Sequence, residues 1–514
     1  MLVTVIQPAP SMAVGADRAM GADDTVVTAV TLDSRRVDPG VLFAAAPGER
    51  ADGHTFVEEA VVRGAVAVLV EAPVVGLTVP QIVVHATRPA AALLAAWCAG
   101  FPSRHLGIIG ITGTDGKTTT SYLVRAILEA ADRPTGLLGT VDVIIGGVSL
   151  GNVARTTTPE APELQGSLAS MVDAGDGWAV VEASSHGLAQ DRVGEVAWDV
   201  AVLTNVTEEH LEFHRTIEAY RAAKLQLFGA LAVGDANPEK GFGKTAVLNL
   251  DDGAAQAFAT AARAAAATVI GYGQSASASI RLTDVREDAQ RLHVGLQTPR
   301  WNGTLALHLA GRFNAHNAAA AVAVGEALAL EPDAIRAGLE GVEGVPGRME
   351  RIDVGQPFVL VLDYAHTADA LAKVLDELAP IAAHGGGGLI VVFGSAGDRD
   401  RVKRPAMGHV AGLRCRLVVL TDEDPRTEDR MTILEAIAVG AEEAGRRRDR
   451  DLLLVPDRRA AIRTAIAEAR PGDVVLLAGK GHEKSIEMAG GDIAWDEGLE
   501  ARRSLADAGW GLEV

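Results

Sequence analysis

The residues best suited to chemistry in this chain run from Gly110 to Thr120 and read Gly-Ile-Thr-Gly-Thr-Asp-Gly-Lys-Thr-Thr-Thr. Glycines in such a turn let backbone N–H groups close around a phosphate, and a following helix adds its positive end. Lys117 is placed to contact the β- and γ-phosphates, and the Thr118 hydroxyl to reach Mg²⁺. The pattern predicts a nucleotide triphosphate site, although Ile111 stands where a generic phosphate loop has its first glycine.

A strand before this loop and a helix after it are needed to position it, and the sequence on each side predicts them. The apolar run 106–109 predicts a buried strand, and residues 121–130 have helical periodicity. A strand, a glycine-rich turn and a helix in this order is the arrangement that phosphate binding requires. An ordinary glycine turn is the competing interpretation, and the Gly-Lys-Thr sequence argues against it.

Three further polar groups follow apolar segments of the same region. Glu182 comes directly after the expected strand 178–181, and His210 follows the expected strand 200–204. Lys224 lies among apolar neighbours in the expected helix 220–228. A carboxylate such as Glu182 can hold the Mg²⁺ that Thr118 also contacts. A single histidine or lysine is usually structural, but polar groups gathered at strand ends beside a phosphate loop favour a catalytic site.

The chain divides into three segments, 1–105, 106–340 and 341–514. Short strands and one helix, near 55–63, are expected in the first segment. Alternating strands and alanine-rich helices predict a mostly parallel α/β sheet in the second and another in the third. The expected strands are 26–31, 65–70, 81–84, 178–181, 200–204, 246–250, 268–271, 304–309, 358–362, 389–393, 417–421, 452–455 and 474–478.

Composition narrows the class of protein. With 47 Lys and Arg against 67 Asp and Glu, the net charge of −20 argues against general affinity for nucleic acid or anionic membranes. Two distant cysteines, Cys98 and Cys415, indicate reduced thiols. No apolar run approaches the roughly 20 residues of a membrane span, and the N-terminus lacks the features of a signal peptide. These features predict a cytoplasmic enzyme.

The ordered motifs of the whole chain resemble those of the Mur ligases. They include Asp33-Ser-Arg-Arg36, the phosphate loop, Thr156-Thr-Thr-Pro159, Glu182-Ala-Ser-Ser-His186, Asp363-Tyr-Ala-His366, Asp424-Pro-Arg426 and Gly479-Lys-Gly-His-Glu483. Within that family, the chain is similar to the ligases that add the third residue to the UDP-N-acetylmuramoyl peptide. The resemblance implies a three-domain α/β architecture, with a central P-loop ATPase-like parallel sheet and a C-terminal Rossmann-like domain.

The resemblance also implies a reaction and a role for each matching residue. Such a ligase uses ATP and Mg²⁺ to convert the peptide carboxylate into an acyl phosphate, which an amino acid attacks to form an amide during peptidoglycan precursor synthesis. The substrates are small molecules, and the enzyme is expected to be a monomer. The first segment would bind UDP-muramoyl substrate, the second ATP, and the third the amino acid.

The residues to which the resemblance gives a role fall into five groups. The implied catalytic residues are Lys117, Glu182, His210 and Lys224, with Lys224 carbamylated, and the implied metal ligands are Thr118, Glu182, His210 and Lys224. The implied ATP-binding residues are Gly113, Thr114, Asp115, Gly116, Lys117, Thr118, Thr119, Asn317, Arg348 and Asp363. The UDP-muramoyl dipeptide would meet Ser34, Thr157, Thr158, Ser184 and Arg192. The amino-acid substrate would meet Arg399, Asp424, Arg426, Gly479 and Glu483.

The amino-acid motif departs from the family pattern. Relatives that add meso-diaminopimelate typically carry Asp-Asn-Pro-Arg, and this chain has Glu423-Asp-Pro-Arg426. Arg426 suits the extra carboxylate of diaminopimelate, because a guanidinium group can donate two parallel hydrogen bonds to one carboxylate. A carboxylate at Asp424 favours instead the bare amine of lysine or ornithine. We expect diaminopimelate, with L-lysine or L-ornithine as the alternative.

Two other functions are open from the sequence. The folylpolyglutamate ligases share the ATP core, but the Asp33–Arg36 block and the Gly479–Glu483 motif argue against them. A non-catalytic nucleotide-binding scaffold is opposed by the intact Lys117, Glu182, His210 and Lys224. A binding test with the UDP-sugar peptide separates the first from a Mur ligase, and ATP turnover with substrates excludes the second.

Overall fold

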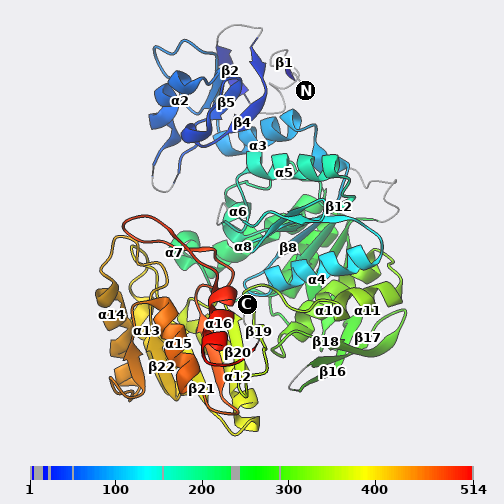
Figure 1. Ribbon diagram of the computed structural model, residues 1–514. Coiled ribbons are helices and arrows are strands. Elements are labelled where there is room, and N and C mark those ends of the chain that lie inside the picture. Colours follow the sequence, from blue (N-terminus) through cyan, green and yellow to red (C-terminus); the bar gives the residue numbers. More distant parts are fainter. Residues whose placement is uncertain are drawn as a thin grey trace. The chain divides into compact units, whose positions relative to one another are not determined.

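The computed structural model describes residues 3–4, 16–20, 25–48, 51–152, 156–232, 243–288 and 291–511 of the chain (Figure 1). It separates into two compact units. The first unit contains residues 1–283, 296–303 and 316–339, and the second contains 284–295, 304–315 and 340–514. No helix within the described ranges is long and apolar enough to cross a membrane.

The N-terminal part of the first unit is built on a five-stranded sheet in the order β2-β7-β6-β5-β4. The 3-10 turn at Gly53–Phe56 and helix α2 together cover the helix expected near 55–63. Apolar residues of α2 and α3 pack on the sheet in two separate core clusters. The elements are β1 (Val3–Thr4), β2 (Ala16–Met20), β3 (Val26–Val27), β4 (Ala29–Thr31), β5 (Val41–Ala44), α2 (Val57–Arg63), β6 (Ala67–Val70), β7 (Gln81–Val84) and α3 (Thr87–Cys98).

The central sheet has the strand order β11-β10-β9-β12-β8-β13-β14-β15-β16-β17-β18. Strands β9, β12, β8, β13, β14 and β15 pair in parallel, which confirms the expected parallel sheet. Its middle strands are buried along their whole length, because helices cover both faces and leave no solvated side. The strands are β8 (Gly107–Thr112), β9 (Thr135–Leu138), β10 (Val143–Ile145), β11 (Val148–Ser149), β12 (Trp178–Glu182), β13 (Val200–Leu203), β14 (Thr245–Asn249), β15 (Thr268–Gly273), β16 (Ile280–Glu287), β17 (Leu292–Gln297) and β18 (Asn302–Leu307).

Strand β8 is longer than the sequence suggested and lies at the centre of this sheet. It continues through Gly110 to Thr112, and α4 then begins at Lys117 (Figure 1). A glycine is needed at Gly110, since a Cβ atom there would lie 2.7 Å from the Trp198 ring. The helices of the region are α4 (Lys117–Ala130), α5 (Ala161–Ala174), α6 (Ser185–Ala189), α7 (Leu211–His214), α8 (Ile217–Gly229), α9 (Ala255–Ala264), α10 (Asn314–Ala327) and α11 (Pro332–Glu340).

The second unit contains a six-stranded sheet in the order β19-β20-β24-β21-β22-β23. All its pairings are parallel except that of β19 with β20. One core cluster joins the sheet to α12, α13 and α14, and another joins it to α15 and α16. The elements are β19 (Glu350–Ile352), β20 (Val359–Asp363), α12 (Ala368–His384), β21 (Leu389–Phe393), α13 (Lys403–Arg414), β22 (Leu417–Leu420), α14 (Arg430–Glu443), β23 (Leu452–Leu454), α15 (Arg458–Glu468), β24 (Val474–Ala478), β25 (Ser485–Ile486), β26 (Ile493–Ala494) and α16 (Glu497–Asp507).

Candidate active site

The glycine-rich turn between β8 and α4 is tightly packed. Gly116 has φ +81°, a left-handed conformation, and a Cβ atom there would lie 2.4 Å from Asn317 Oδ1. At Gly113 a Cβ atom would lie 1.8 Å from Thr204 Oγ1. Both positions therefore require glycine. The turn leads into the N-terminus of the 14-residue helix α4, whose first N–H groups have no partner within the helix and favour an anion.

The ammonium of Lys117 folds back over this turn. Its Nζ donates to the carbonyl oxygens of Gly113 at 3.0 Å and Thr114 at 2.8 Å. The cation is thereby held at the mouth of the loop, where a phosphate would meet both it and the helix N-terminus.

Thr118 and Glu182 come together as predicted. Thr118 Oγ1 donates to Glu182 Oε2 over 3.1 Å, and Glu182 is fully buried at the end of β12. Thr140 contributes a hydroxyl at 2.9 Å and an N–H at 3.1 Å to the two oxygens of the same carboxylate. A hydroxyl beside a fixed carboxylate is an oxygen donor set of the type that Mg²⁺ prefers.

Lys224 is buried beneath the phosphate loop. It lies in α8 with its side chain 1% exposed, and its Nζ donates to the Gly113 carbonyl at 2.7 Å. Burial, reinforced by the charge of Lys117, lowers the pKa of Lys224 well below its ordinary value. The amine is therefore more readily neutral than a surface lysine, which is the state that reacts with CO₂.

His210 lies just before α7 in a strained backbone conformation, with φ +55°. Its ring nitrogens face two carboxylates, Glu212 at 3.3 Å and Glu209 at 3.6 Å. The sequence placed His210 near the phosphate loop, but it gave no role to His186, whose ring centroid lies 4.7 Å from that of His210. Burial, with the charges of His210 and His214, lowers the pKa of His186 to about 4.

Four of the five residues expected to bind the muramoyl substrate lie in a connected group. Thr158 Oγ1 donates to Ser184 Oγ at 3.0 Å, and Arg192 donates to the Thr158 carbonyl at 3.0 Å. The hydroxyl oxygens of Thr157 and Thr140 lie 3.0 Å apart, which connects the group to Glu182. Ser34 lies apart in sequence, in the 3-10 turn after β4, and is 9% exposed.

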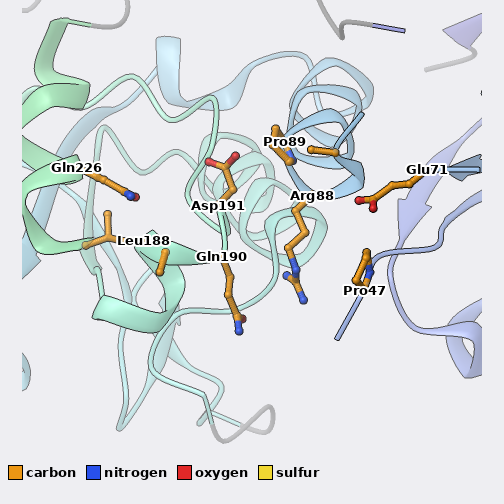
Figure 2. A pocket seen from close by; sticks show the side chains of 10 residues that line it. Pro47, Glu71, Arg88, Pro89, Leu188, Gln190, Asp191 and Gln226 are labelled. Atoms are coloured by element: carbon orange, nitrogen blue, oxygen red, sulfur yellow. The ribbon is translucent and has the colours of Figure 1, made fainter. Parts of the chain in front are cut away.

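A pocket of about 500 Å³ opens within the first unit beside this group. In Figure 2, lining residues of the N-terminal elements, such as Arg88, lie across the pocket from lining residues in and after α6, such as Gln190. Ion pairs from Arg36 to Glu163 at 2.6 Å and from Arg88 to Glu160 at 2.7 Å hold the N-terminal elements to α5. The lining residues are Pro47, Glu71, Ala86, Arg88, Pro89, Leu188, Ala189, Gln190, Asp191 and Gln226, none of which the sequence singled out.

The second unit joins most of the residues expected to bind the amino acid. Lys480, a fully buried residue of the Gly479–Glu483 motif, contacts Asp424 Oδ1 at 2.8 Å and Glu483 Oε2 at 2.5 Å. The same Asp424 oxygen accepts the Glu487 N–H at 2.8 Å. Asp424 is 6% exposed, and it shares the buried Lys480 ammonium with Glu483. No role for Lys480 itself was predicted from the sequence, and sequence reasoning missed this pairing.

Arg426 is more accessible than Asp424. Its Nε donates to Glu487 Oε2 at 2.6 Å and one terminal nitrogen to the Gly397 carbonyl at 3.1 Å. Glu423 is 7% exposed, and among the described residues no donor lies within hydrogen-bond distance of its buried Oε2. Gly479, with φ +98°, brings its backbone close to that oxygen, and Arg399 is exposed on the loop after β21.

A buried ion pair supports the two segments that carry Asp424 and Lys480. Arg458 and Glu497 are each 0% exposed, and their closest atoms lie 2.6 Å apart. The remaining Arg458 donors reach the carbonyl oxygens of Asp422 at 2.9 Å and Ala478 at 2.8 Å. These carbonyls immediately precede the Glu423–Arg426 and Gly479–Glu483 segments, so Arg458 ties together the ends of β22 and β24.

Comparison with known proteins agrees with this arrangement. Residues 26–98 match the Mur ligase family catalytic domain, 111–325 the Mur ligase middle domain, and 347–481 the Mur ligase glutamate ligase domain. The chain is 47% identical to a UDP-N-acetylmuramyl-tripeptide synthetase of Roseiflexus sp. (strain RS-1), over 94% of this chain and 96% of that one.

The chain belongs to the Mur ligase family.

Two further relatives extend the comparison of this Mur ligase. A UDP-N-acetylmuramoyl-L-alanyl-D-glutamate--2,6-diaminopimelate ligase of Solibacter usitatus (strain Ellin6076) is 42% identical, with 95% of each chain covered. A solved structure of a ligase with the same name superposes with a TM-score of 0.63 at 31% identity, covering 94% of this chain and 95% of the other. The three-domain α/β architecture expected from the sequence is thereby confirmed.

The remaining residues that the sequence led us to expect at the ATP site lie in both units. In the first unit, Asn317 Oδ1 accepts from the Thr120 hydroxyl at 3.3 Å, beside Gly116. In the second, Asp363 accepts the N–H groups of Met349 at 2.9 Å and Ala365 at 2.8 Å, and burial raises its pKa. The Arg348 guanidinium stacks 5.0 Å from the Tyr364 ring centroid.

Proposed function

We propose that this Mur ligase joins meso-2,6-diaminopimelate to UDP-N-acetylmuramoyl-L-alanyl-D-glutamate at the expense of ATP, in peptidoglycan precursor synthesis. The names of the Solibacter relative and of the superposed structure support the reaction and the amino acid. The Roseiflexus relative's name supports the reaction and specifies no amino acid.

The observation that carries the choice of amino acid is the Asp424–Lys480 ion pair. A free carboxylate at Asp424 would attract the bare amine of lysine or ornithine. Lys480 Nζ and the Glu487 N–H both contact Asp424 Oδ1 at 2.8 Å, so that charge is already used. Arg426 is the motif residue whose guanidinium is partly exposed, at 22%, and can pair with a distal carboxylate.

The reaction begins with phosphoryl transfer. A carboxylate oxygen of the dipeptide attacks the γ-phosphorus of ATP, the bond to the β,γ-bridging oxygen breaks, and ADP leaves. Lys117 and the α4 N-terminus stabilise the charge of the transferring group, so catalysis is chiefly positioning and electrostatics. We assign Gly113, Thr114, Asp115, Gly116 and Thr119 to the same phosphates, and Asn317, Arg348 and Asp363 to the rest of ATP.

Amide formation follows from the acyl phosphate. An amine nitrogen of diaminopimelate attacks the carbonyl carbon, the carbon–oxygen bond to phosphate breaks, and the nitrogen loses a proton as the amide forms. Arg399, Arg426, Gly479 and Glu483 are the residues we assign to the amino acid, with Glu483 facing its distal ammonium. Burial raises the pKa of Glu483 and Lys480 opposes this effect, so an arriving second cation favours the carboxylate form.

Mg²⁺ fits the oxygen pair of Thr118 and Glu182, whose atoms lie 3.1 Å apart. A bound divalent cation supplies charge neutralisation of the phosphates in such reactions. His210 and Lys224 are assigned to a second cation. The depressed pKa of Lys224 supports its conversion to a carbamate, which changes the side chain from a cation into an oxygen ligand.

The UDP-muramoyl dipeptide is assigned to Ser34, Thr157, Thr158, Ser184 and Arg192. The 500 Å³ pocket adjoins the segment that carries Ser184 and Arg192, and we propose that it receives part of this large substrate. The division of labour expected for 1–105, 106–340 and 341–514 is part of the same proposal, as are a monomeric state and a cytoplasmic location, where reduced Cys98 and Cys415 are stable.

A ligation assay with mass detection tests the proposal. Purified protein, ATP, Mg²⁺ and UDP-N-acetylmuramoyl-L-alanyl-D-glutamate are incubated with diaminopimelate, lysine or ornithine. We expect a tripeptide product with diaminopimelate, and weaker use of lysine and ornithine. Preference for either of those overturns the amino-acid assignment. ADP formation with a folate and glutamate, but not with the muramoyl substrate, would support the folylpolyglutamate alternative, and no turnover with any substrate would support a scaffold.

A further inference from the structure

Two side chains beside His210 have no part in the proposed reaction. His186 comes from α6 and Glu212 from α7, and together with His210 we call them the histidine cluster. One ligand atom of each lies within 4.8 Å of the other two. His210 Nδ1 and Glu212 Oε1 are 3.3 Å apart. The cluster thus gathers two imidazole nitrogens and a carboxylate oxygen from three points of the chain.

Aromatic packing holds the cluster in place. The His186 ring lies edge-on to His210 at 4.7 Å and against Phe213 at 4.3 Å. His214, 8% exposed, lies 5.5 Å from His186, and its buried Nε2 has no hydrogen-bond partner among the described residues. His210 keeps its left-handed backbone at the start of α7, a strained conformation of the kind that persists at functional sites.

We propose that His186, His210 and Glu212 form a binding site for a divalent transition-metal ion, with Zn²⁺ as its representative. Imidazole nitrogens suit Zn²⁺, Co²⁺ and Ni²⁺, whereas Mg²⁺ prefers oxygen ligands. Two histidines and a carboxylate are a known three-ligand set for Zn²⁺, which leaves a fourth position for water.

The ligand set differs from that of the Mg²⁺ pair at Thr118 and Glu182. Zinc–ligand distances near 2.0–2.2 Å bring ligand atoms to about 3.5 Å from one another in a tetrahedral site. The His210–Glu212 pair already has this spacing, so closing the site requires mainly a movement of His186. Since His210 is also assigned to the second cation of the ligation reaction, a bound Zn²⁺ would withdraw it and inhibit ligation. Only this inhibition rests on the proposed function.

Calorimetric titration of the untagged, nucleotide-free protein with Zn²⁺ tests the site. We expect one Zn²⁺ per chain, and at least about tenfold weaker binding in His186→Gln. Glu212→Gln should weaken binding too, and because its side chain is 76% exposed this variant does not disturb packing. His293→Gln, which alters an imidazole paired with Asp288 elsewhere, is the matched control and should bind as the wild type does. Absent binding, or equal binding by wild type and both cluster variants, overturns the proposal.

A fourth variant separates this site from the assigned magnesium positions. Lys224→Ala removes a proposed ligand of the second cation but no member of the histidine cluster. It should lose ligation and keep Zn²⁺ binding. Zn²⁺ affinity lost in Lys224→Ala to the same extent as in His186→Gln would show that the ion occupies the second-cation position, which contradicts a separate site. Failure of ligation in the wild type would leave the Zn²⁺ result intact, so the two proposals fail independently.

Discussion

Arg426 offers the sharpest test of how this ligase selects its amino acid. In the structure its guanidinium is paired with Glu487 at 2.6 Å, and both side chains are about one quarter exposed, 22% and 26%. A distal carboxylate of diaminopimelate must therefore compete with Glu487 for the same donors. Arg426→Ala removes the recognition of that carboxylate, and Glu487→Gln removes the competitor.

The size of the expected change in kcat/KM follows from two interactions of Arg426, one with the substrate carboxylate and one with Glu487. A hydrogen bond to a charged group contributes about 1.5–3 kcal/mol, and an accessible ion pair such as Arg426–Glu487 about 0.5–1 kcal/mol. Their difference, about 1–2 kcal/mol, predicts that Arg426→Ala lowers kcat/KM for diaminopimelate about 5–30-fold. Relief of the competition predicts that Glu487→Gln raises it about 2–5-fold. Lysine has no distal carboxylate. We therefore expect neither Arg426→Ala nor Glu487→Gln to change kcat/KM for lysine in the way that it changes kcat/KM for diaminopimelate.

The assay measures kcat/KM for diaminopimelate, lysine and ornithine with each variant under identical conditions. Asp424→Asn is a useful companion, since the amide oxygen can still accept the Glu487 N–H and Lys480 keeps Glu483 at 2.5 Å. We expect it to leave the ratio between diaminopimelate and lysine nearly unchanged. Equal losses for all three amino acids in Arg426→Ala would refute carboxylate recognition. A wild-type preference for lysine that disappears in Asp424→Asn would show that Asp424 faces the substrate.

Three other changes test separate parts of the molecule. Lys117→Ala should lower ligation at least about 100-fold by removing charge from the transferring phosphoryl group, and near-normal turnover would exclude that role. Lys224→Ala should be inactive and recover partly with added acetate or formate, whereas a fully active variant contradicts the carbamate. Hydrogen bonds from Arg404 lower the pKa of Glu428 to about 2. Ionised Glu428 therefore stabilises the folded protein at pH values above its unfolded pKa near 4.5, and this stabilisation is lost as the pH falls toward 2. In urea unfolding, Glu428→Gln should be less stable than wild type at about pH 7, and the gap should narrow near pH 2; a gap independent of pH would contradict this pairing.

Local patterns predicted much of the fold and the phosphate loop. Strands β7, β21 and β24 have the bounds expected from the sequence, because each is a short run of mainly apolar residues. Strand β8 was expected over the apolar run 106–109 but continues to Thr112, and at Gly110 the space beside the strand is filled by Trp198. The meeting of Thr118 with Glu182 follows from the parallel neighbours β8 and β12, in which Glu182 is paired with Ile111.

Local sequence patterns could not predict the ion pairs between segments that are far apart in the chain. Asp424 and Lys480 are 56 residues apart, and Arg426 and Glu487 are 61 apart. Each looks like an ordinary charged residue in the sequence, and only the order of β22 and β24 in the sheet brings the segments together. The sequence therefore indicated a conflict between Asp424 and Arg426 that the buried Lys480 removes. His186 escaped notice for the same reason, since its neighbours belong to α7 and not to its own helix.

The Arg458–Glu497 pair bears on how easily this pocket can change its preference over evolution. Arg458 holds the two segments proposed to bind the amino acid through the backbone carbonyl oxygens of Asp422 and Ala478, a group that every amino acid possesses. The hydrogen bonds from Arg458 therefore do not depend on which side chains stand at positions 423–426 and 479–483. New selectivity can arise there by point substitution while the strand ends stay in register, whereas a change at Arg458 or Glu497 would leave a buried charge unpaired, at about 3–5 kcal/mol. Variation among relatives should accordingly concentrate in the pocket and spare this pair.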